Sequence, residues 1–471
     1  MIGCLLRQKF FTWCALVVSA CLTVIAIEGR PNAQPAGSLP PAHVFDVAPV
    51  FPLTLSPGKR YLEDTHGQPF LIHGDAAWSL IADLTQEDVD RYLEDRHARG
   101  FNTLLVSMIE HRYAKNAPAN AYGQSPFLTA GDFGTPNEQY FAHADWVLRR
   151  AEEKGFLVLL APAYAGASGG NEGWYQEMVK NGPAKLRRYG QYLGKRYAKL
   201  TNLLWVHGGD YNPPQKELVE AIAEGIQEFE PKALNTAHCA PETAAIDFWD
   251  REPWLQVSNV YTYKPVYLAA LDHFDRHKST PFFLIESSYE NEHGSTEQIL
   301  RTQAYQAILS GAMGQVFGNN PIWHFDGPGL FSAPGSWREQ LGSRGAISMT
   351  HLRALFGTMP WWTLEPDTGN HLLKAGHQSG ESRAVAGLSA DRSIAVVYLP
   401  TIRNLTLDLR ELAGPNVSMR WYDPANGQYT DIVASDFESQ KMQTVTIGPR
   451  ANNSSGSGDW VLILKATQAR Y

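Results

Sequence analysis

Cysteine is scarce in this sequence, with 4 residues among 471. Three of them, Cys4, Cys14 and Cys21, lie near the N-terminus, so only Cys239 remains in the body of the chain. The body therefore has no internal disulfide, and its hydrophobic core must supply the stability alone. The same scarcity excludes a cysteine-rich zinc site. Cys239 could serve as a nucleophile, but an isolated cysteine of this kind is more often a small buried core residue.

Three further patterns are missing from the chain. It contains 40 Lys and Arg against 48 Asp and Glu, and no long basic segment, which argues against a nucleic acid partner. No glycine-rich phosphate loop follows the first expected strand, which disfavours a doubly wound open sheet, the main alternative to a barrel. The sequence also shows no internal repeats.

The N-terminus has the pattern of an export signal. Arg7 and Lys9 precede an apolar run from Phe10 to Ile27, so residues 1–30 read as a cleaved signal peptide or a retained membrane anchor. The segment "VSAC" also resembles a lipoprotein cleavage box. Residues 31–49 form a Pro-rich linker. We expect an exported protein, periplasmic, at the cell surface or secreted, which contacts a membrane only through its anchor or lipid.

Short apolar runs alternate with helical patterns over residues 50–358. "TQEDVDRYLEDRHARG" predicts a helix with a capping box at Thr85 and Asp88, and "STEQILRTQAYQAILSG" predicts one with a box at Ser295 and Gln298. Further helices are expected at 140–155 and 183–199. Eight strands alternating with helices predict a (β/α)8 TIM barrel. The expected strands begin in 69–78 and continue at 102–109, 156–164, 202–210, 233–239, 255–263, 281–287 and 314–320.

The pattern changes in residues 359–471. Short alternating or apolar runs such as "SIAVVYLP", "LTLDLREL" and "WVLILK" are separated by Gly, Pro, Asn and Asp, without a long helical pattern. These features predict a C-terminal all-β sandwich.

Polar and aromatic residues follow the expected strands at their C-terminal ends. In a TIM barrel these ends face one shared pocket, so the side chains should converge there. Trp78, Tyr164 and Trp323 could equally be core aromatics, and Asp75 could be a turn residue. The candidate substrate-binding residues are Asp75, Trp78, His111, Tyr164, His207, Tyr261, Tyr263, Asn319 and Trp323.

Two carboxylates are the strongest catalytic candidates. Asp210 follows the fourth expected strand behind Gly208 and Gly209, and Glu286 ends the seventh in "FFLIES". Glycoside hydrolysis uses two acids on opposite sides of a pocket. One protonates the leaving oxygen, and the other attacks the sugar or activates water. The two strands lie on different sides of the barrel mouth, so a sugar can sit between the acids. In the barrel glycosidases that this chain resembles, acids at these two strand ends face each other closely, which implies a retaining enzyme with Glu286 as the nucleophile.

Two other functions remain open at this stage. His73, Asp75, His207 and His238 could hold a divalent ion in a metal-dependent hydrolase, although their spacing matches no metal motif. A non-catalytic glycan-binding adhesin is the second alternative. Otherwise the sequence indicates no cofactor and no metal.

Several segments resemble one family. "FPLTLSPGKRYLEDTHGQPFLIHGDAAWSL", "DVDRYLEDRHARGFNTLLV", "NLLWVHGGD" and "PFFLIESSYE" resemble the apiosidase-like glycoside hydrolases. The segment through "WYDPANGQY" is similar to the β-domain that often follows, which carries the label of a collagen-binding domain of a collagenase. The resemblance covers residues 50–465. It implies a TIM-barrel glycosidase with Asp210 as acid/base and Glu286 as nucleophile, acting on branched plant cell-wall polysaccharide such as apiose-bearing pectin. The sugar, the linkage, exo or endo action and the oligomeric state stay open.

Overall fold

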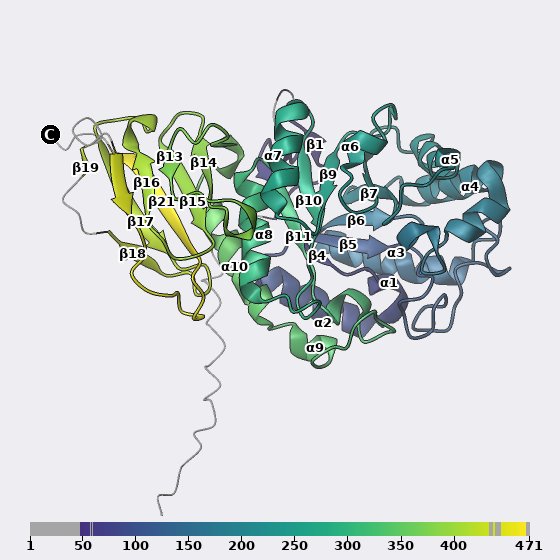
Figure 1. The fold of residues 1–471 in the computed structure, drawn as a ribbon. Coiled ribbons are helices and arrows are strands. Elements are labelled where there is room, and N and C mark those ends of the chain that lie inside the picture. Colours follow the sequence, from purple (N-terminus) through teal and green to yellow (C-terminus); the bar gives the residue numbers. More distant parts are fainter. Residues whose placement is uncertain (1–47, 57, 59, 433–436, 439–443, 468–471) are drawn as a thin grey trace, which may run out of the picture. The chain divides into compact units, whose positions relative to one another are not determined.

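Eight parallel strands form the centre of the first domain (Figure 1). The computed structural model describes residues 48–56, 58, 60–432, 437–438 and 444–467. The strands run in the order β8-β7-β6-β5-β4-β11-β10-β9, and the outer two, β8 and β9, lie in contact, so the sheet curves into the expected (β/α)8 barrel. The strands are β4 (Ile72–Ala76), β5 (Thr103–Ser107), β6 (Leu157–Ala161), β7 (Leu203–Gly208), β8 (Leu234–His238), β9 (Ser258–Tyr261), β10 (Phe282–Glu286) and β11 (Gly314–Phe317).

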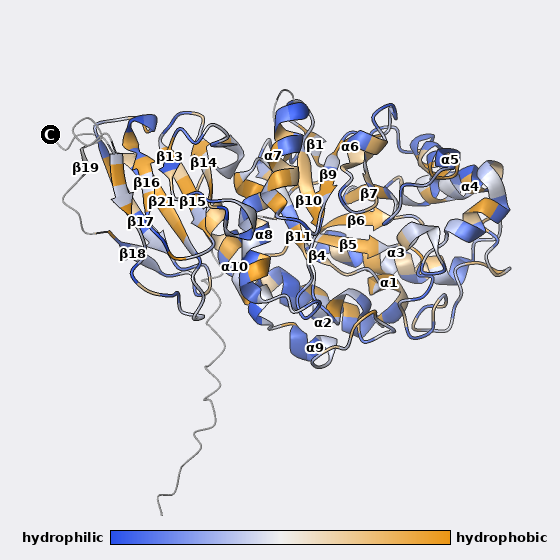
Figure 2. Cartoon of the chain, in the orientation of Figure 1, coloured by the Kyte–Doolittle hydropathy of each residue, from blue (hydrophilic) through white to orange (hydrophobic). Residues whose placement is uncertain are grey.

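The barrel strands are almost wholly buried. Every residue of β5, β6 and β7 is buried, which is why these strands read as continuous apolar runs and do not alternate. Figure 2 shows hydrophobic residues along these strands and mixed polar and apolar residues on helices such as α4 and α5. Parallel strands covered on both faces therefore account for the pattern that predicted the barrel.

Helices alternate with the strands, and the structure tests two predicted helix caps. The predicted cap of α2 is confirmed, because the Thr85 side chain accepts a hydrogen bond from the Asp88 backbone N–H. The predicted box at Ser295 and Gln298 is wrong: α8 is preceded by Thr296, and the Ser295 N–H is bonded in a turn to Glu292. The helices are α1 (Leu80–Asp83), α2 (Gln86–Ala98), α3 (Glu138–Glu153), α4 (Tyr175–Tyr197), α5 (Lys216–Gln227), α6 (Ala245–Phe248), α7 (Val266–Arg276), α8 (Glu297–Leu309), α9 (Trp337–Gln340) and α10 (Arg344–Gly357).

A small antiparallel sheet precedes the barrel and was not predicted. It consists of β1 (Thr54–Leu55), β2 (Leu62–Glu63) and β3 (Pro69–Phe70). Helix α4 is also longer than predicted, because it continues across a kink at Gly182, where φ is 70°.

The C-terminal domain contains two antiparallel sheets, as expected for a β-domain. One sheet has the order β12-β14-β15-β21-β17-β18, with β19 paired to β17, and the other has the order β13-β16-β20. The apolar residues of both sheets form a core of their own. The strands are β12 (Leu364–Pro366), β13 (Leu373–Ala375), β14 (Val385–Ser389), β15 (Ile394–Leu399), β16 (Leu405–Asp408), β17 (Asn416–Tyr422), β18 (Tyr429–Asp431), β19 (Phe437–Glu438), β20 (Thr444–Ile447) and β21 (Trp460–Thr467).

The β-domain packs against the barrel through α8, which contacts β14 and β15. Arg301 on α8 makes two hydrogen bonds to Asp459, at 2.7 and 2.8 Å, and both side chains are fully buried. The Tyr305 and Tyr398 rings stack with centroids 4.7 Å apart. These contacts join the barrel and the β-domain.

Residues 1–47 lie outside the described part of the chain, so the predicted leader and most of the linker have no structural counterpart here. Among the described residues, no helix has the length and apolar character needed to cross a bilayer.

Candidate active site

Asp210 is positioned by an unusual turn at the end of β7. Gly208, Gly209 and Asp210 all have positive φ, at 79°, 135° and 53°. A Cβ on Gly209 would lie 2.4 Å from Cδ2 of Tyr164, so only glycine fits against that ring. The Tyr164 hydroxyl donates to Oδ2 of Asp210 at 3.2 Å, while Oδ1 has no partner among the described residues. The two glycines therefore turn the Asp210 carboxylate toward Tyr164.

Glu286 ends β10 and lies beside the end of β8. Its Oε2 is 2.9 Å from Nε2 of His238, and the Tyr263 hydroxyl is 3.5 Å from Oε1. Burial raises the pKa of Glu286, the His238 N–H opposes this, and the negative charge of Asp210 adds to it.

His238 connects the two carboxylate residues. Its Nδ1 is 2.9 Å from the backbone nitrogen of Asp210. A backbone N–H can only donate, so Nδ1 accepts, and the ring proton resides on Nε2, where it is donated to Glu286. One buried imidazole thus orients the Asp210 turn and holds the Glu286 carboxylate.

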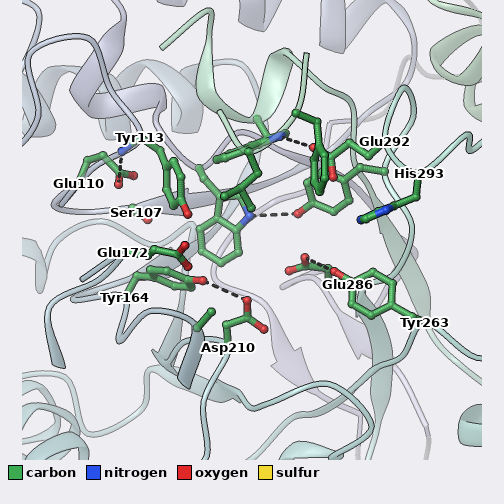
Figure 3. Close-up of a pocket in the computed structure, with 16 residues that line it drawn as sticks. Ser107, Glu110, Tyr113, Tyr164, Glu172, Asp210, Tyr263, Glu286, Glu292 and His293 are labelled. Atoms are coloured by element: carbon green, nitrogen blue, oxygen red, sulfur yellow. Dashed lines mark hydrogen bonds between the residues drawn. The ribbon is translucent and has the colours of Figure 1, made fainter. Parts of the chain in front are cut away.

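Both carboxylates line one cavity of about 180 Å³ (Figure 3). Trp78 lies against it, with its indole N–H donating to Tyr289 at 3.1 Å and its ring 5.5 Å from that of Tyr164. The remaining lining residues are Ser107, Glu110, Tyr113, Ala167, Glu172, Tyr263, Glu292, His293, Trp323, Leu330 and Phe331.

Six of the eleven predicted site residues meet in this cavity: the two catalytic candidates, and Trp78, Tyr164, Tyr263 and Trp323. Trp323 donates its N–H to Oε1 of Glu292 at 2.8 Å. The roles assigned to these residues remain predictions, but their position agrees with them.

Asp75, His207 and Asn319 lie outside the cavity lining, and each is hydrogen-bonded to another buried residue. Asp75 is 0% exposed and bonded to Arg96 at 2.5 Å and to the Tyr92 hydroxyl at 2.6 Å. The predicted substrate contact of Asp75 is therefore corrected to a structural role, in which it anchors α2 to β4. Its side chain points outward to the helix because neighbouring strand residues face opposite sides.

His207 and Asn319 have comparable partners. The imidazole Nε2 of His207 is 2.8 Å from Oδ1 of Asn235, and the amide of Asn319 donates to Glu290 at 2.8 Å. Both side chains are buried and outside the cavity lining, so neither reaches substrate in this structure.

His111 and Tyr261 lie next to the cavity without lining it. His111 is 3.5 Å from Glu177 and packs on the edge of Trp174. The Tyr261 hydroxyl is 2.9 Å from that of Tyr263, which in turn reaches Glu286, so Tyr261 supports the site through its neighbour.

Several cavity residues were missed because they come from loops. Glu172, Tyr289, Glu292 and the rim residues Leu330 and Phe331 follow no expected strand directly. Burial raises the pKa of Glu292 to about 7, opposed by the Trp323 N–H and reinforced by Glu286. For Tyr289 and Glu292, the sequence signal was the concentration of acidic and aromatic residues between positions 286 and 292.

The residues of the metal alternative are dispersed. His73 stacks on Phe101, while Asp75, His207 and His238 pair with Arg96, Asn235 and Glu286. Within the part of the chain that the structure describes, no three His, Cys, Asp or Glu residues form a group able to hold a metal ion.

Comparison with known proteins agrees with this geometry. A family model described as "Apiosidase-like, catalytic domain" matches residues 56–363, and one described as "Putative collagen-binding domain of a collagenase" matches residues 366–465. A solved glycoside hydrolase is similar in structure, with a TM-score of 0.77 at 22% identity, over 89% of this chain and 99% of that one. A glycoside hydrolase family 5 protein from Bacteroides vulgatus ATCC 8482 gives 0.77 at 21%, over 88% and 92%.

These two likenesses show the shared fold, and no curated protein matches this chain. The catalytic-domain match spans well over half of the sequence and contains every residue of the cavity. The chain belongs to the apiosidase-like family of glycoside hydrolases.

Proposed function

We propose that this enzyme cleaves the glycosidic bond of a neutral sugar in a branched plant cell-wall polysaccharide, with retention of anomeric configuration. The observation that carries the proposal is that Asp210 and Glu286, each at the end of a barrel strand, line the same cavity. The family match supports the substrate class.

In this mechanism, Glu286 attacks the anomeric carbon and Asp210 protonates the departing oxygen. Water then attacks the sugar bound to Glu286 and releases it, while Asp210 accepts the proton that this water loses. The His238 N–H keeps Glu286 oriented and favours its ionised form, as a nucleophile requires. Asp210 lines the same cavity as Glu286, so its carboxyl group is placed to exchange the proton with the departing oxygen and with water.

The charge of the cavity supports a neutral sugar. Five carboxyl groups line it, those of Glu110, Glu172, Asp210, Glu286 and Glu292, and none of its described lining residues is Lys or Arg. A sugar carboxylate placed there would be repelled without a compensating cation.

The deciding experiment is a screen of plant and bacterial polysaccharides for released sugars, followed by proton NMR of the earliest product. We expect release of a neutral sugar whose anomer matches that of the substrate. An early product of the opposite anomer would recast Glu286 as a base acting through water. Absence of any released sugar across the screen would favour the adhesin alternative.

We also propose that the protein is exported, because Arg7 and Lys9 precede the apolar run from Phe10 to Ile27. Expression with the complete leader, followed by fractionation and N-terminal sequencing, tests this proposal. A lipid label lost in Cys21→Ala would identify lipidation, and an intact leader in the membrane fraction would identify an anchor. An intact protein in the cytoplasmic fraction would contradict export.

A further inference from the structure

The catalytic cavity is too small for a polysaccharide. Its volume is about 180 Å³. Pockets that enclose a drug-sized ligand measure roughly 300–1,000 Å³. If the enzyme acts on a polymer, as the proposed function states, most of the polysaccharide must lie outside this cavity.

A larger groove begins directly beside the cavity. It has a volume of about 450 Å³ and shares two wall residues with the cavity, Tyr263 and His293. Figure 3 shows both on the same side of the site, next to Glu286. Ser287 and Ser288, which follow Glu286 in the chain, line the groove. A glycan leaving the cavity past Tyr263 would therefore enter it.

The lining of the groove suits sugar hydroxyls. It is rich in Ser, Thr and Gln side chains, and its charged groups are of both signs. Gln303 is only 6% exposed, and its amide donates to the Ser288 carbonyl at 2.9 Å, which fixes the side chain in the groove wall. The Tyr263 side chain, 53% exposed, offers an apolar face to a sugar ring.

The β-domain forms the opposite wall. Ser382, Pro400 and Thr401 line the groove from that domain. This wall is bonded to the barrel, because the Gln298 amide on α8 donates to the Pro400 carbonyl at 2.8 Å.

We propose that this groove is a second glycan-binding site, in which barrel and β-domain together hold the polysaccharide segment adjoining the sugar in the catalytic cavity. The β-domain then acts as part of the substrate site, and the enzyme prefers polymers to small glycosides. This inference rests on the proposed function.

The test fills the groove without touching the catalytic residues. Ser382→Trp blocks it from the β-domain, and Ile299→Trp, at a position that is 42% exposed on α8, blocks it from the barrel. The matched control is Ser418→Trp, at an exposed position on β17 outside the groove. Each variant is assayed on the polysaccharide found in the screen and on the 4-nitrophenyl glycoside of the released sugar, and melting temperatures confirm folding.

We expect both blocking variants to lower kcat/KM on the polymer by about three- to tenfold or more. A loss of this size corresponds to one or two hydrogen bonds between enzyme and glycan. Activity on the small glycoside should stay unchanged, and the control should behave as wild type. Equal activity of all variants on the polymer would overturn the proposal, as would equal losses on both substrates by folded variants.

A binding measurement separates this proposal from the proposed function. Glu286→Gln, with and without Ser382→Trp, is run through native gels containing pectin, arabinogalactan or xyloglucan. Retardation that Ser382→Trp abolishes supports the groove even if no glycoside is hydrolysed, and retardation that it leaves unchanged contradicts it. Absence of retardation in all three gels, with wild-type turnover of the small glycoside, rejects the groove and leaves the proposed function standing.

Discussion

Substitution of Gly209 by alanine should impair catalysis and also destabilise the protein. The new Cβ would lie 2.4 Å from the Tyr164 ring, whereas ordinary contact begins at 3.4 Å, so the ring or the Asp210 turn must move by about 1 Å. A misplacement of this size at a catalytic group costs up to about 100-fold in rate. The positive φ of 135° adds strain on the order of 1–3 kcal/mol.

The assay is kcat/KM on a glycoside with a poor leaving group, which depends on Asp210, together with the melting temperature. Gly67→Ala is the matched control, because Gly67 has φ of 72° but open space around its Cβ position. Because of its strained φ, Gly67→Ala should lower the free energy of unfolding by about 1 kcal/mol, and it should keep nearly full activity. If Gly209→Ala retains activity within threefold of wild type, the turn does not position the acid as argued.

Three further predictions follow from the same structure. Asp210→Ala should lose about 10²–10⁴-fold on glycosides with poor leaving groups, and much less on activated ones, because only the former need a proton; equal losses would argue against the assignment. Glu286 must be ionised to attack, and burial raises its pKa, so activity should fall as the pH drops through a pKa above the usual range. In His238→Phe the N–H that favours the ionised form is lost, so the acid limb of kcat/KM against pH should move to higher pH; an unmoved limb would contradict this. Arg301→Met should lower the free energy of unfolding by about 3–5 kcal/mol, because it leaves the Asp459 carboxylate buried and unpaired.

The control for the last prediction is an exposed ion pair. Arg420 bonds Asp431, with side chains 46% and 72% exposed, so Arg420→Met should cost about 1 kcal/mol or less. Denaturant unfolding measures both variants. Similar small losses in the two would show that the interdomain pair contributes little.

The fold could be predicted because parallel barrel strands are buried on both faces. Their apolar runs, such as Leu203–Val206 and Phe282–Ile285, stand out in the sequence, and the acids that follow them, Asp210 and Glu286, lie at the shared end of the barrel. The spacing of Thr85 and Asp88 also predicted a helix start correctly, since a cap depends on neighbours in the chain.

The sequence by itself thus determined the barrel, the β-domain and the place of the two carboxylates. Only the tertiary structure decided which polar side chains reach the cavity. Asp75 and Asn319 looked equivalent to Asp210, but their partners, Arg96 and Glu290, lie on other elements and hold them in the protein interior. The loop residues of the cavity lie far apart in the sequence, and so do the barrel and β-domain residues that line the groove. No local sequence pattern predicts that these segments lie side by side.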